Sequence, residues 1–189
     1  MLCTAPVTFQ HEEDGMSRQE VYSIEYPDDP WASLVTWDLP QTGSPLWRKE
    51  ALLDVGGWKE DQPVCQEHEL YLRLLKAGKR FQYHESGGAV YRQWSDDTVC
   101  RRDEAKTYRH RLAIMREAEA HMNEKGLMTP ARREALDRAY LACSRMIWLF
   151  DPEWARSIMD HVSEANSGSF TPPADQVPPA YRWIFRTLG

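Results

Sequence analysis

The sequence predicts an α/β region over residues 1–100, followed by an all-helical region over residues 101–189. Short segments of alternating apolar and polar residues flank segments of helical periodicity as far as about residue 94. From Asp103 onward, helical segments with capping signals follow one another without strand signals. The hydrophobic content of 42% is ordinary for a folded domain. The length suits one domain, or a half-domain with an appendage.

The first half of the α/β region predicts the end of one strand, two further strands and one helix. Residues 1–9 are expected to end a strand whose partners lie upstream, and residues 10–30 are expected to be a loop around a short strand at Val21–Ile24. A second strand is predicted over Gly43–Arg48 and a helix over Lys49–Val55. The helix is expected to end at Gly56-Gly57, because a helix C-terminus often needs a left-handed residue.

The second half predicts a helix and two more strands. Four apolar residues recur at helical spacing within Gln66–Ala77, and Gly78 is expected to terminate that helix. Alternation over Lys79–His84 and Ala89–Trp94 predicts two strands.

The second region predicts a helix from Asp103 to about Lys125 and two further helices. These open at Thr129-Pro130 and at Asp151-Pro152, where an oxygen-bearing cap precedes a proline in the first helical turn. A short last helix is expected over Ala180–Leu188.

Composition restricts the class of protein. The net charge of -6 argues against a nucleic-acid-binding protein, which needs a basic face. No apolar segment reaches the roughly 20 residues of a membrane span, and no secretory signal is visible. The four cysteines contain no Cys-x-x-Cys pair, which favours free thiols. We therefore expect a cytoplasmic protein.

Two stretches carry a family resemblance. They are residues 41–58, QTGSPLWRKEALLDVGGW, and residues 65–78, CQEHELYLRLLKAG. Together they resemble the acceptor-side half of a family-2-type glycosyltransferase with the GT-A fold. The resemblance covers residues 1–100 and is most specific over 41–94. It implies a partial GT-A-like mixed sheet with flanking helices, and inverting transfer of a hexose from a nucleotide-sugar to an acceptor hydroxyl. The nucleotide-binding half of such an enzyme lies upstream, so the chain is expected to be inactive or nearly so by itself.

The resemblance implies a catalytic base at the start of the helix after the Gly-Gly-aromatic turn. The family commonly places Glu-Asp there, and the alignment puts Gln66 and Glu67 over that pair. Glu67 is therefore the candidate base, although its extra methylene moves the carboxylate by about 1 Å. The alternative is that Glu67 and Glu69 simply favour a helix N-terminus. His68 takes the family's aromatic position, and either lines the acceptor pocket or packs against the sheet. Cys65-x-x-His68 lacks the partner pair of a zinc site.

Other residues are candidates for contacts with substrate. Thr42, Gly43 and Ser44 resemble a loop that enters the active site, where they would bond sugar or diphosphate; an ordinary loop is the alternative. Trp37 is the candidate for stacking on a sugar, whereas the neighbouring tryptophans are expected in the core. Arg92 resembles the family's arginine near the diphosphate, and a structural ion pair is its alternative.

The resemblance also implies Mg²⁺ or Mn²⁺ in the complete enzyme, to neutralise the diphosphate. The chain contains no Asp-x-Asp motif, and Asp28-Asp29 and Asp96-Asp97 are expected to be turn residues. No metal ligand is therefore assigned in this chain.

The expected partners are a nucleotide-sugar and a hydroxyl acceptor, without nucleic acid. A sheet that lacks its first strands also exposes an edge, where we expect a partner chain or a second copy to pair. The alternative function is a non-catalytic, transferase-like module that binds carbohydrate or a protein.

Overall fold

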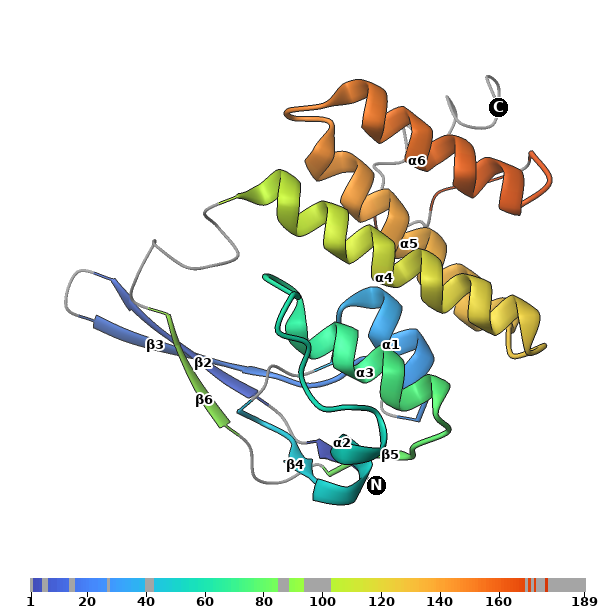
Figure 1. Ribbon diagram of the computed structural model, residues 1–189. Helices are drawn as coiled ribbons and strands as arrows, with labels where there is room; N and C mark the ends of the chain where they lie inside the picture. The colour runs from blue at the N-terminus through green and yellow to red at the C-terminus, as the bar shows by residue number, and fades with distance from the viewer. Residues whose placement is uncertain are drawn as a thin grey trace. The chain divides into compact units, whose positions relative to one another are not determined.

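The computed structural model describes residues 2–168, apart from residues 5, 6, 14, 15, 27, 40–42, 85–88 and 94–102, together with residues 170, 172 and 176. The chain divides into two compact units, Met1–Gly126 and Leu127–Gly189. Figure 1 shows the elements of both units. The division falls after residue 126, whereas the sequence placed it at residue 100, so the long helix that follows Asp103 belongs to the first unit.

The first unit is mixed α/β, and its described strands form two three-stranded sheets in which the central strand has one antiparallel and one parallel neighbour. In one sheet, β1 (Leu2–Thr4) pairs antiparallel with β4 (Leu46–Trp47) and parallel with β5 (Phe81–Tyr83). In the other, β2 (Val7–Glu13) pairs antiparallel with β3 (Met16–Tyr22) and parallel with β6 (Ala89–Gln93). Each sheet therefore has a strand from the N-terminus at its centre.

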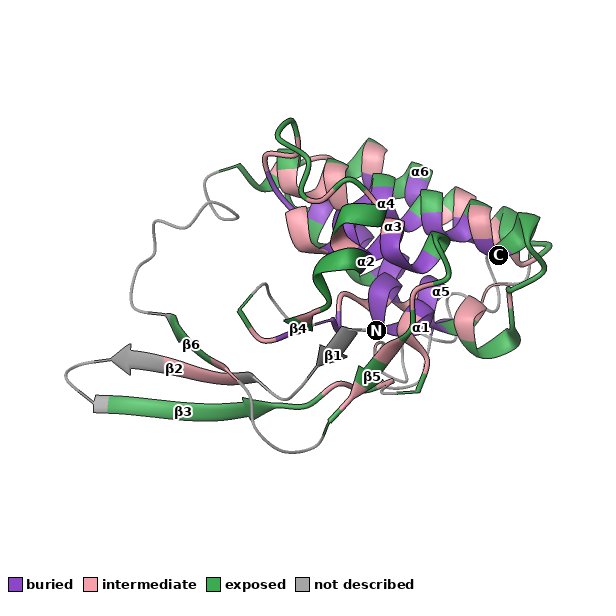
Figure 2. Cartoon of the chain, turned by 60° about the horizontal axis from the view of Figure 1, so that its bottom comes forward, coloured by how far each residue is buried: buried purple, intermediate pink, exposed green. Residues whose placement is uncertain are grey.

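The described part of the first unit also contains the helices α1 (Pro30–Thr36), α2 (Lys49–Asp54), α3 (Gln66–Lys76) and α4 (Glu104–Glu124). Helices α1, α3 and α4 contact one another, and buried residues concentrate on α1 and α3 (Figure 2). Leu70 and Leu74 of α3 pack with Ala51 of α2, and Trp47 and Phe81 of the β4-β1-β5 sheet lie against this cluster. The core thus joins α3 to one of the two sheets.

The second unit contains α5 (Pro130–Ile147) and α6 (Pro152–Ala165), which pack together. Thr129 and Asp151 cap these helices, accepting hydrogen bonds from the backbone N–H groups of Arg132 and Trp154. The predicted openings at both prolines are confirmed. Of the helices in the described ranges, none is long and apolar enough to cross a membrane.

Several elements differ from the sequence prediction. Residues 1–9 hold β1 and the start of β2, whose partner strands lie downstream and not upstream. The strand predicted over Gly43–Arg48 is reduced to β4, Leu46–Trp47. The segment around Pro30 was predicted as loop, but it begins α1: the Asp29 side chain accepts hydrogen bonds from the N–H groups of Trp31 and Ala32. The strand predicted at Val21–Ile24 is instead β3, which starts at Met16 and forms a hairpin with β2. The predicted last helix, residues 180–188, lies outside the described residues.

Candidate functional site

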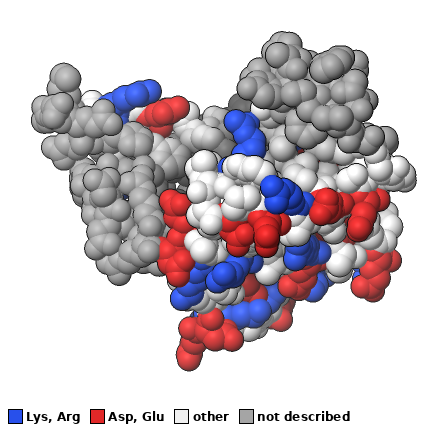
Figure 3. Space-filling view, turned by 90° about the horizontal axis from the view of Figure 1, so that it is seen from above, with Lys and Arg blue, Asp and Glu red and all other residues white. Residues whose placement is uncertain are grey.

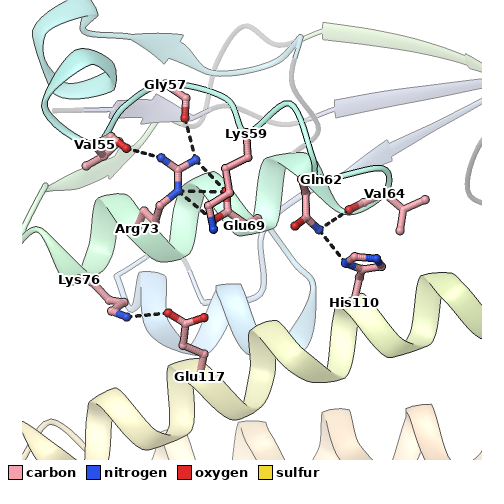
Figure 4. Close-up of polar contacts among 10 residues, drawn as sticks. All are labelled: Val55, Gly57, Lys59, Gln62, Val64, Glu69, Arg73, Lys76, His110 and Glu117. Carbon is pink, nitrogen blue, oxygen red and sulfur yellow. Dashed lines mark hydrogen bonds and ion pairs between the residues drawn. The ribbon is translucent and has the colours of Figure 1, made fainter.

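Helix α3 holds the glycine turn that precedes the candidate site. Gly56 and Gly57 follow α2 with φ values of 81° and 67°, a conformation that other residues adopt only with strain. Arg73 of α3 donates hydrogen bonds to the carbonyl oxygens of Val55 and, at 2.7 Å, of Gly57 (Figure 4). The turn is therefore fixed to α3 by one guanidinium group.

The same guanidinium group binds Glu69. Nε of Arg73 lies 2.9 Å and 3.0 Å from the two carboxylate oxygens of Glu69, and Nζ of Lys59 lies 2.6 Å from one of them. Burial alone would raise the pKa of Glu69, but the bonds from Arg73 and Lys59 outweigh burial and lower it. Glu69 is thus an ionised structural residue whose oxygens are occupied by cations.

Glu67 lies two residues earlier, in the first turn of α3, with a half-buried side chain. Unpaired N–H groups and the helix dipole stabilise an anion at this position. Its negative charge also contributes, after burial, to the raised pKa of the Tyr71 phenol. Of the two carboxylates in this first turn, Glu69 is therefore the one whose oxygens are held by cations.

His68 packs against Trp37. The two rings are stacked in parallel, with 3.7 Å between their centroids and 3° between their planes. The guanidinium carbon of Arg111, from α4, lies 4.8 Å from the centroid of the Trp37 ring. Burial, and secondarily the charge of Arg111, lowers the pKa of His68 to about 3. His68 is therefore a neutral packing residue at pH 7, and its partner is Trp37 rather than the sheet.

The stack occupies part of the surface on which a sugar was expected to lie. Trp37 is only partly buried, and it adopts a left-handed conformation, with φ of 69°, at the C-terminus of α1. His68 and Arg111 both contact its ring. Sugar stacking on Trp37 remains a prediction, and it requires the part of the ring that these two residues leave uncovered.

The remaining predicted site residues are distributed over several elements. Gln66 begins α3 and donates a hydrogen bond of 2.9 Å to the Pro63 carbonyl. Gly43 is exposed and Ser44 half-buried in the turn before β4, whereas Thr42 lies outside the described residues. Arg92 is exposed in β6, opposite Gln10 of β2. The structure thus gathers Gln66, Glu67, His68 and Trp37 at α3, and places Arg92 in the sheet that does not contribute to the α3 core.

Helix α4 supplies residues that the sequence analysis did not find. Gln62, in the loop before α3, donates a hydrogen bond to the Val64 carbonyl at 2.6 Å and lies 3.1 Å from Nδ1 of His110 (Figure 4). Lys76 and Glu117 form an ion pair of 2.6 Å between α3 and α4. Helical periodicity located α4, but it carried no signal of what the helix packs against.

The described residues hold no set of metal ligands. Within them, no three or more His, Cys, Asp or Glu side chains gather closely enough to bind a metal ion. The Mg²⁺ or Mn²⁺ expected of a complete transferase therefore finds no fitting ligand set here, and no chemical step is assigned to it.

A small hollow of about 10 Å³ lies beside α2. Its lining is largely apolar, with two basic side chains, and consists of Trp47, Arg48, Ala51, Leu52, Leu74, Lys79 and Phe81. None of the predicted site residues belongs to this lining. Lys79 is ion-paired with Asp54 at 2.6 Å.

Basic and acidic side chains are interspersed on the face shown in Figure 3. Such a mixed surface differs from the continuous basic face of a nucleic-acid-binding protein.

Comparison of the chain with family models, with curated proteins and with solved structures found no match.

Proposed function

We propose that this chain supplies the acceptor side of an inverting, nucleotide-sugar-dependent glycosyltransferase, with Glu67 as the general base. The observation that carries the proposal is the placing of Glu67: a carboxylate in the first turn of α3, behind a Gly-Gly turn that Arg73 fixes to the same helix. The neighbouring carboxylate, Glu69, is paired with Lys59 and Arg73, which argues against Glu69 as the base.

In the proposed reaction, Glu67 removes the proton of an acceptor hydroxyl while that oxygen attacks the anomeric carbon of the donor. A carbon–oxygen bond forms on one face of the sugar, and the bond to the nucleoside diphosphate breaks on the other. The proton passes from Glu67 to solvent. Positioned general bases of this kind contribute about 10²- to 10⁴-fold to a rate.

A donor assay tests this proposal. The chain is incubated together with the nucleotide-binding half of a family-2-type glycosyltransferase, a panel of nucleotide-sugars, Mn²⁺ and a mixture of carbohydrate and glycolipid acceptors, and release of nucleoside diphosphate is measured. We expect release that falls about 10²- to 10⁴-fold in Glu67→Gln. Glu50→Gln is the matched control, because Glu50 is an exposed carboxylate in the first turn of α2.

Calorimetric titration of UDP with Mn²⁺ completes the test. Binding that disappears in Arg92→Ala would assign Arg92 to the diphosphate. If nucleoside diphosphate is not released even with the nucleotide-binding half supplied, and UDP does not bind, a transferase role for this chain is contradicted.

One observation favours a second candidate, a non-catalytic module that binds carbohydrate or a protein. Trp37 and His68 pack against each other at 3.7 Å, an arrangement that stabilises a domain without any reaction. Binding to a glycan array without release of nucleoside diphosphate, and with equal affinity in Glu67→Gln, would favour this candidate.

A further inference from the structure

Among the strands that the structure describes, β3 lies at an edge of the sheet formed by β3, β2 and β6. The strand order places β3 at one side of this sheet, hydrogen-bonded to β2. Every residue from Ser17 to Tyr22 is exposed, and Figure 2 shows β3 as a continuous exposed strand. An edge of this length presents a row of backbone N–H and C=O groups that can pair with another strand.

The two faces of this sheet also carry exposed apolar residues. Tyr22 and Tyr91 lie on one face, where both rings contact Phe9 edge-on at 6.0 Å and 5.6 Å. Val21 and Val90 are exposed on the opposite face, and Val21 is 66% exposed. A three-stranded sheet of this kind gains stability when further strands extend it.

The sequence of β3 is complementary to itself. Arg18 and Glu20 flank Gln19, and side chains two residues apart lie on the same face of a strand. If two copies of β3 pair antiparallel about an axis through Gln19, Arg18 of each copy lies opposite Glu20 of the other. Two cross-strand pairs of opposite charge then form on one face, and each such pair is stabilising.

The other free edge of the sheet lacks this property. A pairing of β6 with a second β6, centred on Tyr91, would place Val90 opposite Arg92. An apolar side chain would then oppose a charge at both sides of the axis. Charge complementarity therefore favours β3 as the edge that pairs, and a second copy of this chain as its partner.

We propose that the chain forms a homodimer through antiparallel pairing of β3 with β3 of a second copy, centred on Gln19. The two three-stranded sheets then form one six-stranded sheet, in which β3 of each copy is an inner strand. This inference does not depend on a transferase activity.

Charge reversal tests the pairing. Arg18→Glu and Glu20→Arg each replace two attractive pairs by two repulsive ones, so each is expected to weaken dimerisation at least about tenfold. The two variants are complementary to each other, and a mixture of them should form a heterodimer as tightly as the native chain forms a homodimer. The double variant Arg18→Glu/Glu20→Arg should also dimerise. Sedimentation equilibrium of each variant and of the mixture measures these constants.

A cysteine placed on the axis tests the register. Opposite residues of paired strands have Cα atoms about 4.5–5.5 Å apart, which is within disulfide range. Gln19→Cys should therefore form a covalent dimer under mild oxidation. Val21→Cys is the control: Val21 would face Ser17, so two copies of residue 21 lie roughly 13 Å apart and should not join. The native chain measures the background from its own cysteines.

Three results would overturn the proposal. One is a native chain that stays monomeric at all accessible concentrations. Another is a dimer whose affinity is unchanged by either charge reversal. The third is cross-linking of Val21→Cys as efficient as that of Gln19→Cys, which would show pairing in another register or none.

Discussion

Aromatic side chains are buried on helix α3 but exposed on the sheet of β3, β2 and β6. Tyr71 of α3 is 0% exposed, and its ring contacts Trp47, Phe81 and His68. Tyr91 of β6 is 36% exposed and contacts Phe9. The comparison indicates that the α3 region forms a core of the first unit, whereas the sheet leaves apolar side chains exposed to solvent.

The largest change in stability is expected when the ring of Tyr71 is removed, and removal of the Tyr91 ring is the comparison. Tyr71→Ala should lower the free energy of unfolding by about 3–5 kcal/mol, because it leaves a cavity where four rings meet. Tyr91→Ala removes the same atoms from a surface and should cost no more than about 1 kcal/mol. Urea unfolding of the two variants measures both changes. Equal losses would mean that the sheet contributes as much to stability as α3 does.

The two carboxylates in the first turn of α3, Glu67 and Glu69, are expected to differ in how much they contribute to stability. Glu69→Gln keeps the shape of the side chain but removes the charge that Arg73 and Lys59 neutralise. Breaking a largely buried ion pair of this kind should cost about 2–3 kcal/mol. Glu67→Gln should cost less than about 1 kcal/mol, since a role in binding does not require a role in folding. A larger loss in Glu67→Gln than in Glu69→Gln would reverse the assignment of these residues.

The stack of His68 on Trp37 predicts a dependence of stability on pH. Folding lowers the pKa of His68 from 6.5 to about 3, because burial and Arg111 disfavour its charged form. Between these values the unfolded chain binds a proton at His68 and the folded chain does not, so stability falls as pH falls. The loss is about 1.4 kcal/mol per pH unit, or about 2 kcal/mol between pH 7 and pH 5.

His68→Phe removes this titration and keeps an aromatic ring in the stack. We therefore expect the native chain to lose about 2 kcal/mol more than His68→Phe between pH 7 and pH 5. Unfolding curves at the two pH values measure the difference. Parallel losses in the two proteins would show that His68 is accessible to protons in the folded state.

Much of the fold followed from local signals in the sequence. The predicted positions of α2, α3, α5 and α6 are confirmed, because glycine stops, caps before proline and apolar periodicity are all local. Asp29-Pro30 carries the same signal as Thr129-Pro130, yet α1 was missed. Helix α1 has only seven residues, which is too short for apolar periodicity to separate it from a loop.

The hairpin was missed for a different physical reason. Strand β3 reads Met-Ser-Arg-Gln-Glu-Val-Tyr, and its side chains from Ser17 to Tyr22 are exposed on both faces. Alternation arises only where one face is buried, so an edge strand in solvent lacks the pattern that predicts strands.

The candidate site was predictable only in part. The position of Glu67 in the first turn of a helix followed from the spacing of apolar residues after it. The bond from Arg73 to the Gly-Gly turn and the approach of Arg111 to Trp37 are contacts between distant segments. No local spacing signals such contacts, because tertiary packing decides them.

The smallest change in the free energy of unfolding is expected at the hydrogen bond between Tyr22 of β3 and Asp38, which follows α1. The hydroxyl of Tyr22, at the end of β3, donates a hydrogen bond to the buried Asp38 carboxylate, which also accepts one from the Glu25 N–H. Burial raises the pKa of Asp38 although both bonds oppose that rise. Tyr22→Phe removes one of the hydrogen bonds to Asp38 and should cost about 1 kcal/mol.

Tyr91→Phe is the matched control for this variant, since Tyr91 lies on the same face of the sheet with its ring against Phe9. If Tyr22 joins the sheet to the core, Tyr22→Phe should speed hydrogen exchange of the β2 and β3 amides while leaving exchange in α3 unchanged. Faster exchange in α3 as well would mean that the hairpin and the helix unfold as one unit. The contrast between the two regions would then concern their exposure to solvent and not their stability.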